Sequence, residues 1–178
     1  GGKTYQYTYS SGGLLLTKRD PLGHQNTFTY NADGRLIRND NAGAGSTTFT
    51  RTGNAVDFTV AHRDPLNRIS SYRVINDANG DETVINTYPD GSRSRLSTTA
   101  DGSTFGTDIL GTVGETNLGP DPRWRMQSPL ISSSRIETPG GVTFRAAYNR
   151  TVSLPDVTNP FSLTQQTESL AINGNIYS

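Results

Sequence analysis

Hydrophobic and polar residues alternate along short stretches of this chain, and turn-forming residues separate the stretches. Tyr5, Tyr7 and Tyr9 fall on one side of an extended segment, and Phe28 and Tyr30 do the same in a later one. A period of two is typical of β-strands, whose side chains point alternately to opposite faces. No segment of helical length carries an apolar period of 3.6 residues. The sequence therefore predicts an all-β fold with almost no helix.

The turn residues recur at a nearly constant spacing of eleven residues. The residues with this spacing are Gly12, Gly23, Gly34, Gly45 and Asn67. After an offset of two residues, the spacing continues with Gly80, Gly91 and Gly102. Glycine, and to a lesser degree asparagine, accepts the positive φ that closes a tight turn. Segments 20–23, 64–67 and 88–91 also place proline at the first central position, where its fixed φ favours a turn. We therefore expect these residues to lie in hairpin turns.

The spacing between turns predicts a repeating hairpin. About seven residues separate successive turns, so two strands and two turns make a unit of about 22 residues. We expect residues 1–105 to form such repeats, with Tyr9 and Tyr30 at equivalent places on one face. Residues 106–130 read as an irregular connection, and residues 131–178 as longer hairpins that continue the same sheet. The predicted architecture is repeated antiparallel β-hairpins in one continuous, twisted sheet.

The composition predicts a thin sheet whose surfaces are largely exposed to water. Hydrophobic residues make up 31% of the chain and charged residues 18%, and the formal net charge is zero. A zero balance argues against nucleic acid as a partner, because counterion displacement needs a basic excess. The chain has no cysteine and no apolar run long enough to span a membrane as a helix. No cofactor is indicated.

One segment carries a family resemblance. Residues 30–36, Tyr-Asn-Ala-Asp-Gly-Arg-Leu, resemble the YD-repeat signature Tyr-Asp-x-x-Gly-Arg-Leu, with Asn31 in the aspartate place. Residues 64–69 look like a second copy and residues 9–15 like a weaker one. The resemblance covers residues 5–105. It implies a spiralling shell similar to those of bacterial Rhs proteins, the cocoons of Tc toxins and teneurins.

In such proteins the shell encloses a cargo domain or presents surfaces for adhesion. This chain shows neither the self-cleaving core of the family nor a cargo domain. The resemblance thus implies a partial segment with a structural, non-catalytic role, secreted or at the surface of a bacterium. Its expected partners are the flanking repeats of the same polypeptide. The uncharged strand at residues 5–9 and the strand near residues 175–177 also suggest edge-to-edge contact between copies.

A second interpretation is a carbohydrate-binding or adhesion module whose partner is a polysaccharide. Aromatic rings stack on the apolar faces of sugars, and the candidates for such stacking are Tyr5, Tyr7, Tyr72, Tyr88 and Trp124. The competing explanation is that tyrosines pack across neighbouring strands and stabilise the repeat. A polysaccharide hydrolase or lyase carries less weight, because nothing in the sequence selects a pair of carboxylates.

Few residues suggest other chemistry. Asp77, Asn79 and Asp81 could gather oxygen ligands around calcium, although the EF-hand pattern fails and a solvated turn is the default. His24 and His62 are the two histidines, and no metal-ligand cluster accompanies them. The sequence therefore assigns no catalytic residue and no metal site.

Overall fold

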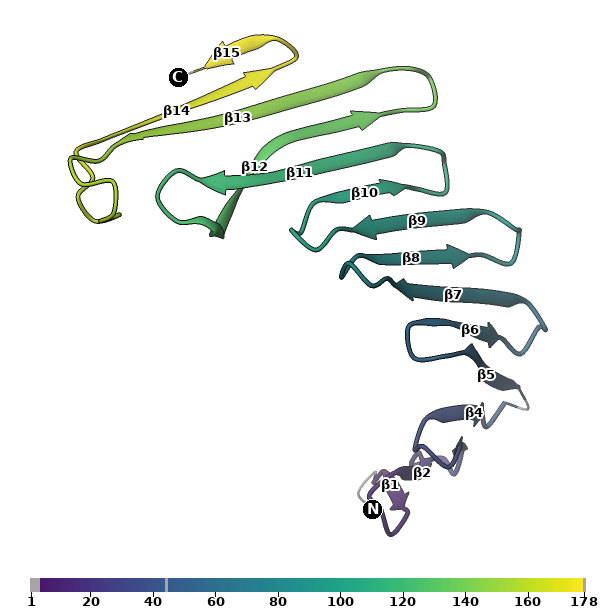
Figure 1. The fold of residues 1–178 in the computed structure, drawn as a ribbon. Helices are drawn as coiled ribbons and strands as arrows, with labels where there is room; N and C mark the ends of the chain where they lie inside the picture. The colour runs from purple at the N-terminus through teal and green to yellow at the C-terminus, as the bar shows by residue number, and fades with distance from the viewer. Residues whose placement is uncertain (1–3, 44, 178) are drawn as a thin grey trace. The chain divides into compact units, whose positions relative to one another are not determined.

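The computed structural model describes residues 4–43 and 45–177, and the regular structure of these residues is entirely β-strand (Figure 1). The strands are β1 (Gln6–Tyr9), β2 (Leu15–Arg19), β3 (Gln25–Tyr30), β4 (Leu36–Asp40), β5 (Ser46–Gly53), β6 (Asp57–Arg63), β7 (Ile69–Asn76), β8 (Glu82–Thr87), β9 (Arg93–Thr98), β10 (Thr104–Thr107), β11 (Val113–Asp121), β12 (Arg125–Glu137), β13 (Thr143–Ser153), β14 (Gln165–Ile172) and β15 (Asn175–Tyr177). They follow one another in a single sheet in the order of the sequence. The predicted all-β antiparallel sheet is confirmed.

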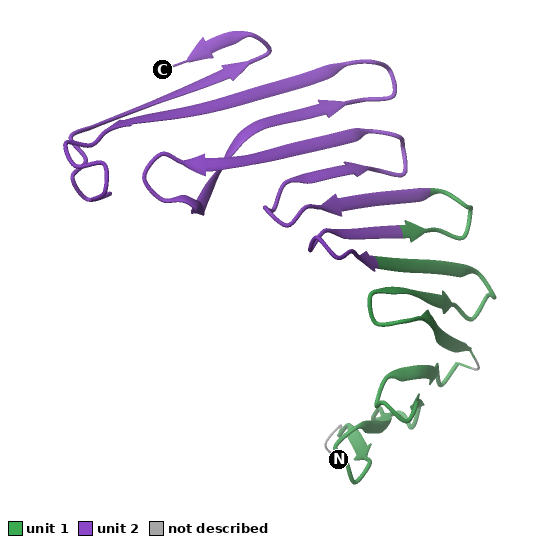
Figure 2. Ribbon diagram, viewed as in Figure 1, with its two compact units in different colours: residues 1–74, 86–92 green, residues 75–85, 93–178 purple. Residues whose placement is uncertain are grey.

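The chain divides into two compact units (Figure 2). One comprises residues 1–74 and 86–92, and the other residues 75–85 and 93–178. This division does not follow the boundaries at residues 105 and 130 that the sequence suggested. Within the described part of the chain no helix is long and apolar enough to cross a membrane.

The turns share one hydrogen-bonding plan. In the turn that begins at Asp20, its backbone N donates to the carbonyl of His24, and the N of Gly23 donates back to the carbonyl of Asp20. The Asp20 carboxylate accepts the backbone N–H groups of Leu22 at 2.8 Å and His24 at 2.9 Å. The first residues Asn31, Asp64, Asp77 and Asp108 use their side chains in the same way. Side chain and backbone thus close the same turn together.

In nine turns of this kind among the described residues, the fourth position has positive φ. It is occupied by Gly13, Gly23, Gly34, Asn67, Gly80, Gly91, Gly102, Gly111 and Gly141. The prediction that Gly12 is the turn glycine is wrong by one residue, since the positive φ is at Gly13. Gly45 is likewise one residue past the fourth position, because its carbonyl accepts the N–H of Asn41. The turns that begin at residues 10, 20, 31 and 41 are ten or eleven residues apart, so a constant spacing of eleven misplaces some positions by one residue.

The irregular connection expected over residues 106–130 is wrong. Most of this segment belongs to β11 and to the first half of β12, which pair along their length. Pro120 and Pro122 suggested a loop, but Pro120 lies where the β11–β12 register is irregular, between Gly119 and Asp121, and Pro122 lies in the turn between the two strands. Proline is tolerated at such places because the ladder there lacks a regular hydrogen bond.

The sheet has no conventional core. No hydrophobic side chain among the described residues is fully buried, and their one fully buried side chain is that of Asp121, 1% exposed. Both faces of the sheet therefore remain substantially hydrated, in agreement with the low hydrophobic content. Among the described residues, the buried carboxylate of Asp121 is the exception to this exposure.

Candidate functional site

The second unit contains a fork in the sheet. Strand β12 pairs with β13 only over residues 133–137 and 143–147. Beyond that ladder β12 continues with β11 alone, and β13 continues with β14 alone. We call residues 117–132 the first arm and residues 148–170 the second arm of this fork, which can be followed in Figure 1. The two arms are joined by side chains instead of backbone hydrogen bonds.

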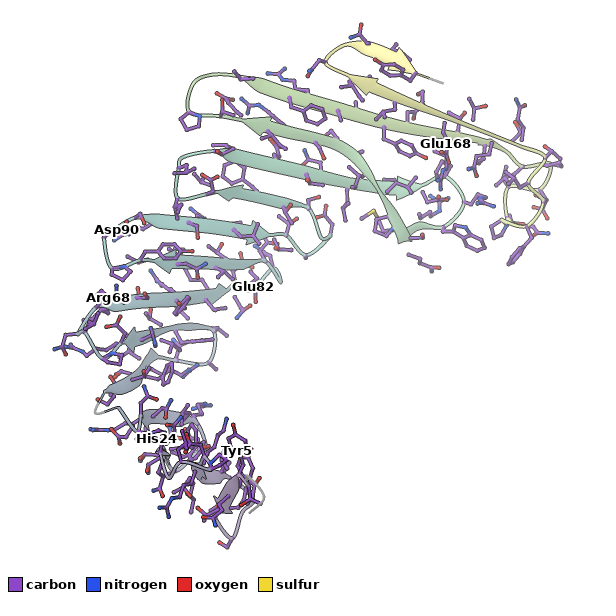
Figure 3. All side chains as sticks on the ribbon, turned by 180° about the vertical axis from the view of Figure 1, so that it is seen from behind. Tyr5, His24, Arg68, Glu82, Asp90 and Glu168 are labelled. Carbon is purple, nitrogen blue, oxygen red and sulfur yellow. The ribbon has the colours of Figure 1, made fainter. Side chains whose placement is uncertain are left out.

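Arg150 of the second arm is the centre of the main contact. Its Nη1 donates to Asp121 Oδ2 of the first arm at 2.7 Å. Its Nη2 and Nε lie 2.7 and 2.9 Å from Glu168 Oε1 on β14, a residue labelled in Figure 3. Nη2 also donates to the hydroxyl of Tyr148 at 3.1 Å. These four residues, the Arg150 cluster, hold the two arms together with charge-assisted hydrogen bonds.

Asp121 also shapes the tip of the first arm. Its Oδ1 accepts the backbone N–H groups of Arg123 at 2.7 Å and of Trp124 at 3.0 Å. The turn so fixed carries the indole of Trp124 against the ring of Phe161, in the loop of the second arm. The two rings are 5.3 Å apart at 74°, an edge-to-face arrangement. One carboxylate therefore positions both the ionic and the aromatic contact between the arms.

The electrostatics follow from these bonds. Burial by itself would raise the pKa of Asp121, but the hydrogen bonds from Arg123, Trp124 and Arg150 outweigh it and lower that pKa. Hydrogen bonding to Tyr148 and then to Arg150 lowers the pKa of Glu168. The bond to Asp121 is the main cause that raises the pKa of Arg150. Both carboxylates and the guanidinium are consequently charged at neutral pH.

The cluster does not have the chemistry of a glycosidase pair. Such a pair needs one carboxyl group that stays protonated to act as general acid. Here the pKa of each acid is lowered, by Arg123, Trp124 and Arg150 at Asp121 and by Tyr148 and Arg150 at Glu168. A small hollow of about 130 Å³ lies between the arms, with Gly119, Pro122, Leu130, Ser132, Tyr148 and Arg150 in its wall. The arrangement fits binding and stiffening rather than proton transfer.

Apart from the three tyrosines in and beside β1, the aromatic residues singled out in the sequence lie far apart along the strand order. Tyr7 and Tyr9 lie in β1 with Tyr5 just before it, Tyr72 lies in β7, Tyr88 begins a turn, and Trp124 lies in the fork. Within the described part of the chain, Trp124 alone of these has another aromatic ring beside it. Tyr5 instead has the Lys18 ammonium 5.6 Å from its ring centroid. The structure does not assemble these tyrosines into one platform.

The calcium hypothesis does not fit the turn at residues 77–81. Asp77 Oδ1 accepts the backbone N–H groups of Asn79 and Asp81, and Asp81 Oδ1 accepts that of Ala100. These oxygens close and dock a turn instead of converging on one point. The described residues contain no group of three or more acidic, histidine or cysteine side chains suited to a metal.

The two histidines also have local roles. His24 Nδ1 lies 2.8 Å from Asp20 Oδ2 within one turn. His62 lies in β6, with its ring 5.3 Å from that of Phe49 on the neighbouring strand.

Sequence reasoning missed Asp121, Arg150, Glu168 and Phe161. The one local signal was the Gly-Pro-Asp-Pro run at residues 119–122, where two prolines stiffen an acidic residue. Arg150 lies 29 residues from Asp121 and 18 from Glu168, so only the fold brings them together.

The chain matches no known family model, and it matches none of the curated proteins.

Proposed function

We propose that this chain is an architectural β-repeat module of the YD/Rhs kind, part of a longer secreted or surface structure of a bacterium. It contributes strands to a sheet that neighbouring repeats extend, and it performs no catalysis itself. The YD-like segments and the shared turn plan support the family. A sheet without buried hydrophobic residues, among those described, supports the architectural role.

The observation that carries the proposal is the pair Tyr9 and Tyr30. Tyr9 pairs with Leu15 and Tyr30 with Leu36, each directly after a register shift, so the two tyrosines are equivalent. Tyr30 is partly buried, and its hydroxyl donates to the carbonyl of Leu15 on the preceding hairpin at 2.9 Å. Tyr9 is 59% exposed. The equivalent tyrosine is thus partly buried in one repeat and exposed in the other. This is expected if a neighbouring repeat packs on Tyr9.

The two outer strands support the same conclusion. In the strand order, β1 pairs only with β2, and β15 only with β14. Strand β1 has no charge and no proline, the usual protections of an open edge. On β15, Ile176 is 75% exposed. We infer that flanking repeats, or copies of the chain, add to these edges.

Light scattering over a wide concentration range tests the proposal. We expect the chain to associate head to tail as its concentration rises. Tyr7→Glu places a charge on the β1 edge opposite Lys18, its cross-strand partner, so the hairpin itself is preserved. Tyr7→Glu and Ile176→Glu should each suppress association, because a head-to-tail contact uses both edges.

Tyr72→Glu is the matched control. Tyr72 is 43% exposed against 47% for Tyr7, but it lies on the interior strand β7. It should leave association unchanged, with far-ultraviolet circular dichroism confirming that all three variants fold. A wild-type chain that stays strictly monomeric and melts cooperatively would overturn the proposal, because its edges would then need no neighbour.

A further inference from the structure

We propose that the tip of the fork binds an acidic polysaccharide, with Trp124 and Phe161 stacking on a sugar ring and Arg123 and Arg125 binding its anionic groups. This adds a binding activity to the architectural role and does not depend on it. The site is made by the ends of the two arms, which the Arg150 cluster holds in place.

The loop that carries Phe161 is built to present it. The Phe161 side chain is 81% exposed, a large apolar surface to leave in water. Its backbone N donates to Asn159 Oδ1 at 3.0 Å. The hydroxyl oxygen of the next residue, Ser162, lies 2.8 Å from the carbonyl oxygens of both Asp156 and Asn159. A loop braced by so many internal bonds loses little entropy when a ligand binds, which favours affinity.

The aromatic pair suits a sugar ring. Phe161 meets Trp124 edge to face, so the two rings form a step with apolar faces turned in different directions. The apolar C–H surface of a pyranose stacks on such faces, while its hydroxyls need polar groups nearby. The Arg123 guanidinium lies 5.8 Å from the indole centroid and supplies such a group beside the stacking surface.

At this tip, the cations without a salt bridge outnumber the carboxylates without one. Asp121 and Glu168 both pair with Arg150, whereas Asp156, whose Oδ1 accepts the N–H and the hydroxyl of Thr158, has no salt bridge within the described residues. Neither Arg123 nor Arg125 has a salt bridge within the described residues. Unpaired guanidinium groups favour carboxylate or sulfate on a ligand over a neutral sugar.

Two further details set these arginines apart. The Arg123 Nε is buried and has no hydrogen-bond partner within the described residues. Arg125 has φ of 53°, although a non-glycine residue with a long side chain seldom adopts that conformation. Strained backbone at the tip of a loop is often retained for binding. Of these two details, the strained φ of Arg125 is the one that points to a ligand.

Binding to immobilised or gel-embedded polymers tests the proposal, with polygalacturonate, dextran sulfate and neutral dextran as the probes. We expect the wild-type chain to bind at least one acidic polymer and not dextran, and to bind more weakly at high salt. Phe161→Ala and Trp124→Ala should each weaken binding about tenfold. The double variant Arg123→Gln/Arg125→Gln should abolish the preference for acidic polymers. Polygalacturonate and dextran sulfate distinguish a carboxylate from a sulfate ligand.

Phe105→Ala and Arg93→Gln are matched controls, because they remove an exposed aromatic and an exposed cation on β10 and β9. They should leave binding unchanged. Binding to neither acidic polymer would overturn the proposal, and so would binding that ignores Phe161→Ala, which indicates charge attraction alone. A change in oligomeric state on Phe161→Ala, without any effect on sugar binding, would overturn it in favour of a protein contact. The edge variant Tyr7→Glu should bind as the wild type does, so this test fails separately from that of the architectural role.

Discussion

The short hairpins of β1 to β10 and the fork of β11 to β14 are held by different kinds of interaction. In the hairpins, turn side chains bond backbone groups two or four residues away, as Asp64 does with Leu66 and Arg68. In the fork, Arg150 reaches Asp121 across 29 residues and Glu168 across 18. The hairpins thus repeat one local solution many times, whereas the fork depends on a single set of distant contacts.

This difference determines how each region responds to substitution. A hairpin that loses one turn bond keeps those of its neighbours, so each change should have a small and local effect. The fork has no such redundancy, because Asp121 takes part in both its ionic and its aromatic contact. We therefore expect the largest effects of single substitutions in the fork.

The largest effect is expected from Asp121→Ala. This change leaves Arg150 without its shortest cross-arm partner and deprives the N–H groups of Arg123 and Trp124 of their acceptor. Breaking a buried ion pair from one side costs about 3 kcal/mol or more. Urea unfolding followed by Trp124 fluorescence should show a loss of that size in the free energy of unfolding.

The control for Asp121→Ala is Asp40→Ala in the hairpin region. The Asp40 carboxylate pairs with Arg38 on the surface of β4, where both side chains are well exposed. Exposed pairs of this kind add little, so no measurable change is expected. If the two variants lose equal stability, the fork has no special status.

A smaller effect should appear in the pH dependence of stability. Because the pKa of Asp121 is lower in the folded chain than its ordinary 3.8, its contribution is fully present above pH 3.8. It is lost as the pH falls through the lower folded-state value. Asp121→Asn removes this titration, so the gap in unfolding free energy between wild type and variant should shrink on acidification. A gap that stays constant from about pH 6 to about pH 2 would show that Asp121 is not ionised in the fold.

The hairpin region could be predicted from the sequence and the fork could not. Turns can be recognised in a sequence because glycine, asparagine and aspartate recur at fixed short spacings, as at Asp64 and Asn67. The strands within residues 106–130 were not predicted, because polar residues and three prolines resemble a loop when no partner strand is known. The Arg150 cluster leaves no spacing to detect, since its members meet only after β11, β13 and β14 have paired.

Gly91→Ala should have a moderate effect confined to one turn. Gly91 has φ of 84°, and a Cβ there would meet no atom within 4 Å, so the cost is backbone strain alone. Strain of this kind destabilises by about 1 kcal/mol. Gly114→Ala is the control, because Gly114 also has free space but lies in strand β11 with ordinary φ. Equal melting temperatures for the two variants would contradict the turn assignment.

The smallest effect separates the two equivalent tyrosines. Tyr30→Phe removes the hydrogen bond to the carbonyl of Leu15 and should cost about 0.5–1 kcal/mol. Tyr9→Phe should cost nothing measurable, because the hydroxyl of Tyr9 has no hydrogen-bond partner within the described residues.

Adding a preceding hairpin should remove this difference between Tyr9 and Tyr30. Tyr9 and Tyr30 are 21 residues apart, so a second copy of residues 4–24 placed directly before Thr4 supplies Tyr9 with the equivalent of Leu15. In that lengthened chain Tyr9→Phe should acquire the cost that Tyr30→Phe has in the original one, as measured by urea unfolding. Because only the preceding hairpin differs between the two chains, an unchanged zero cost would mean that Tyr9 is not a repeat position awaiting a neighbour.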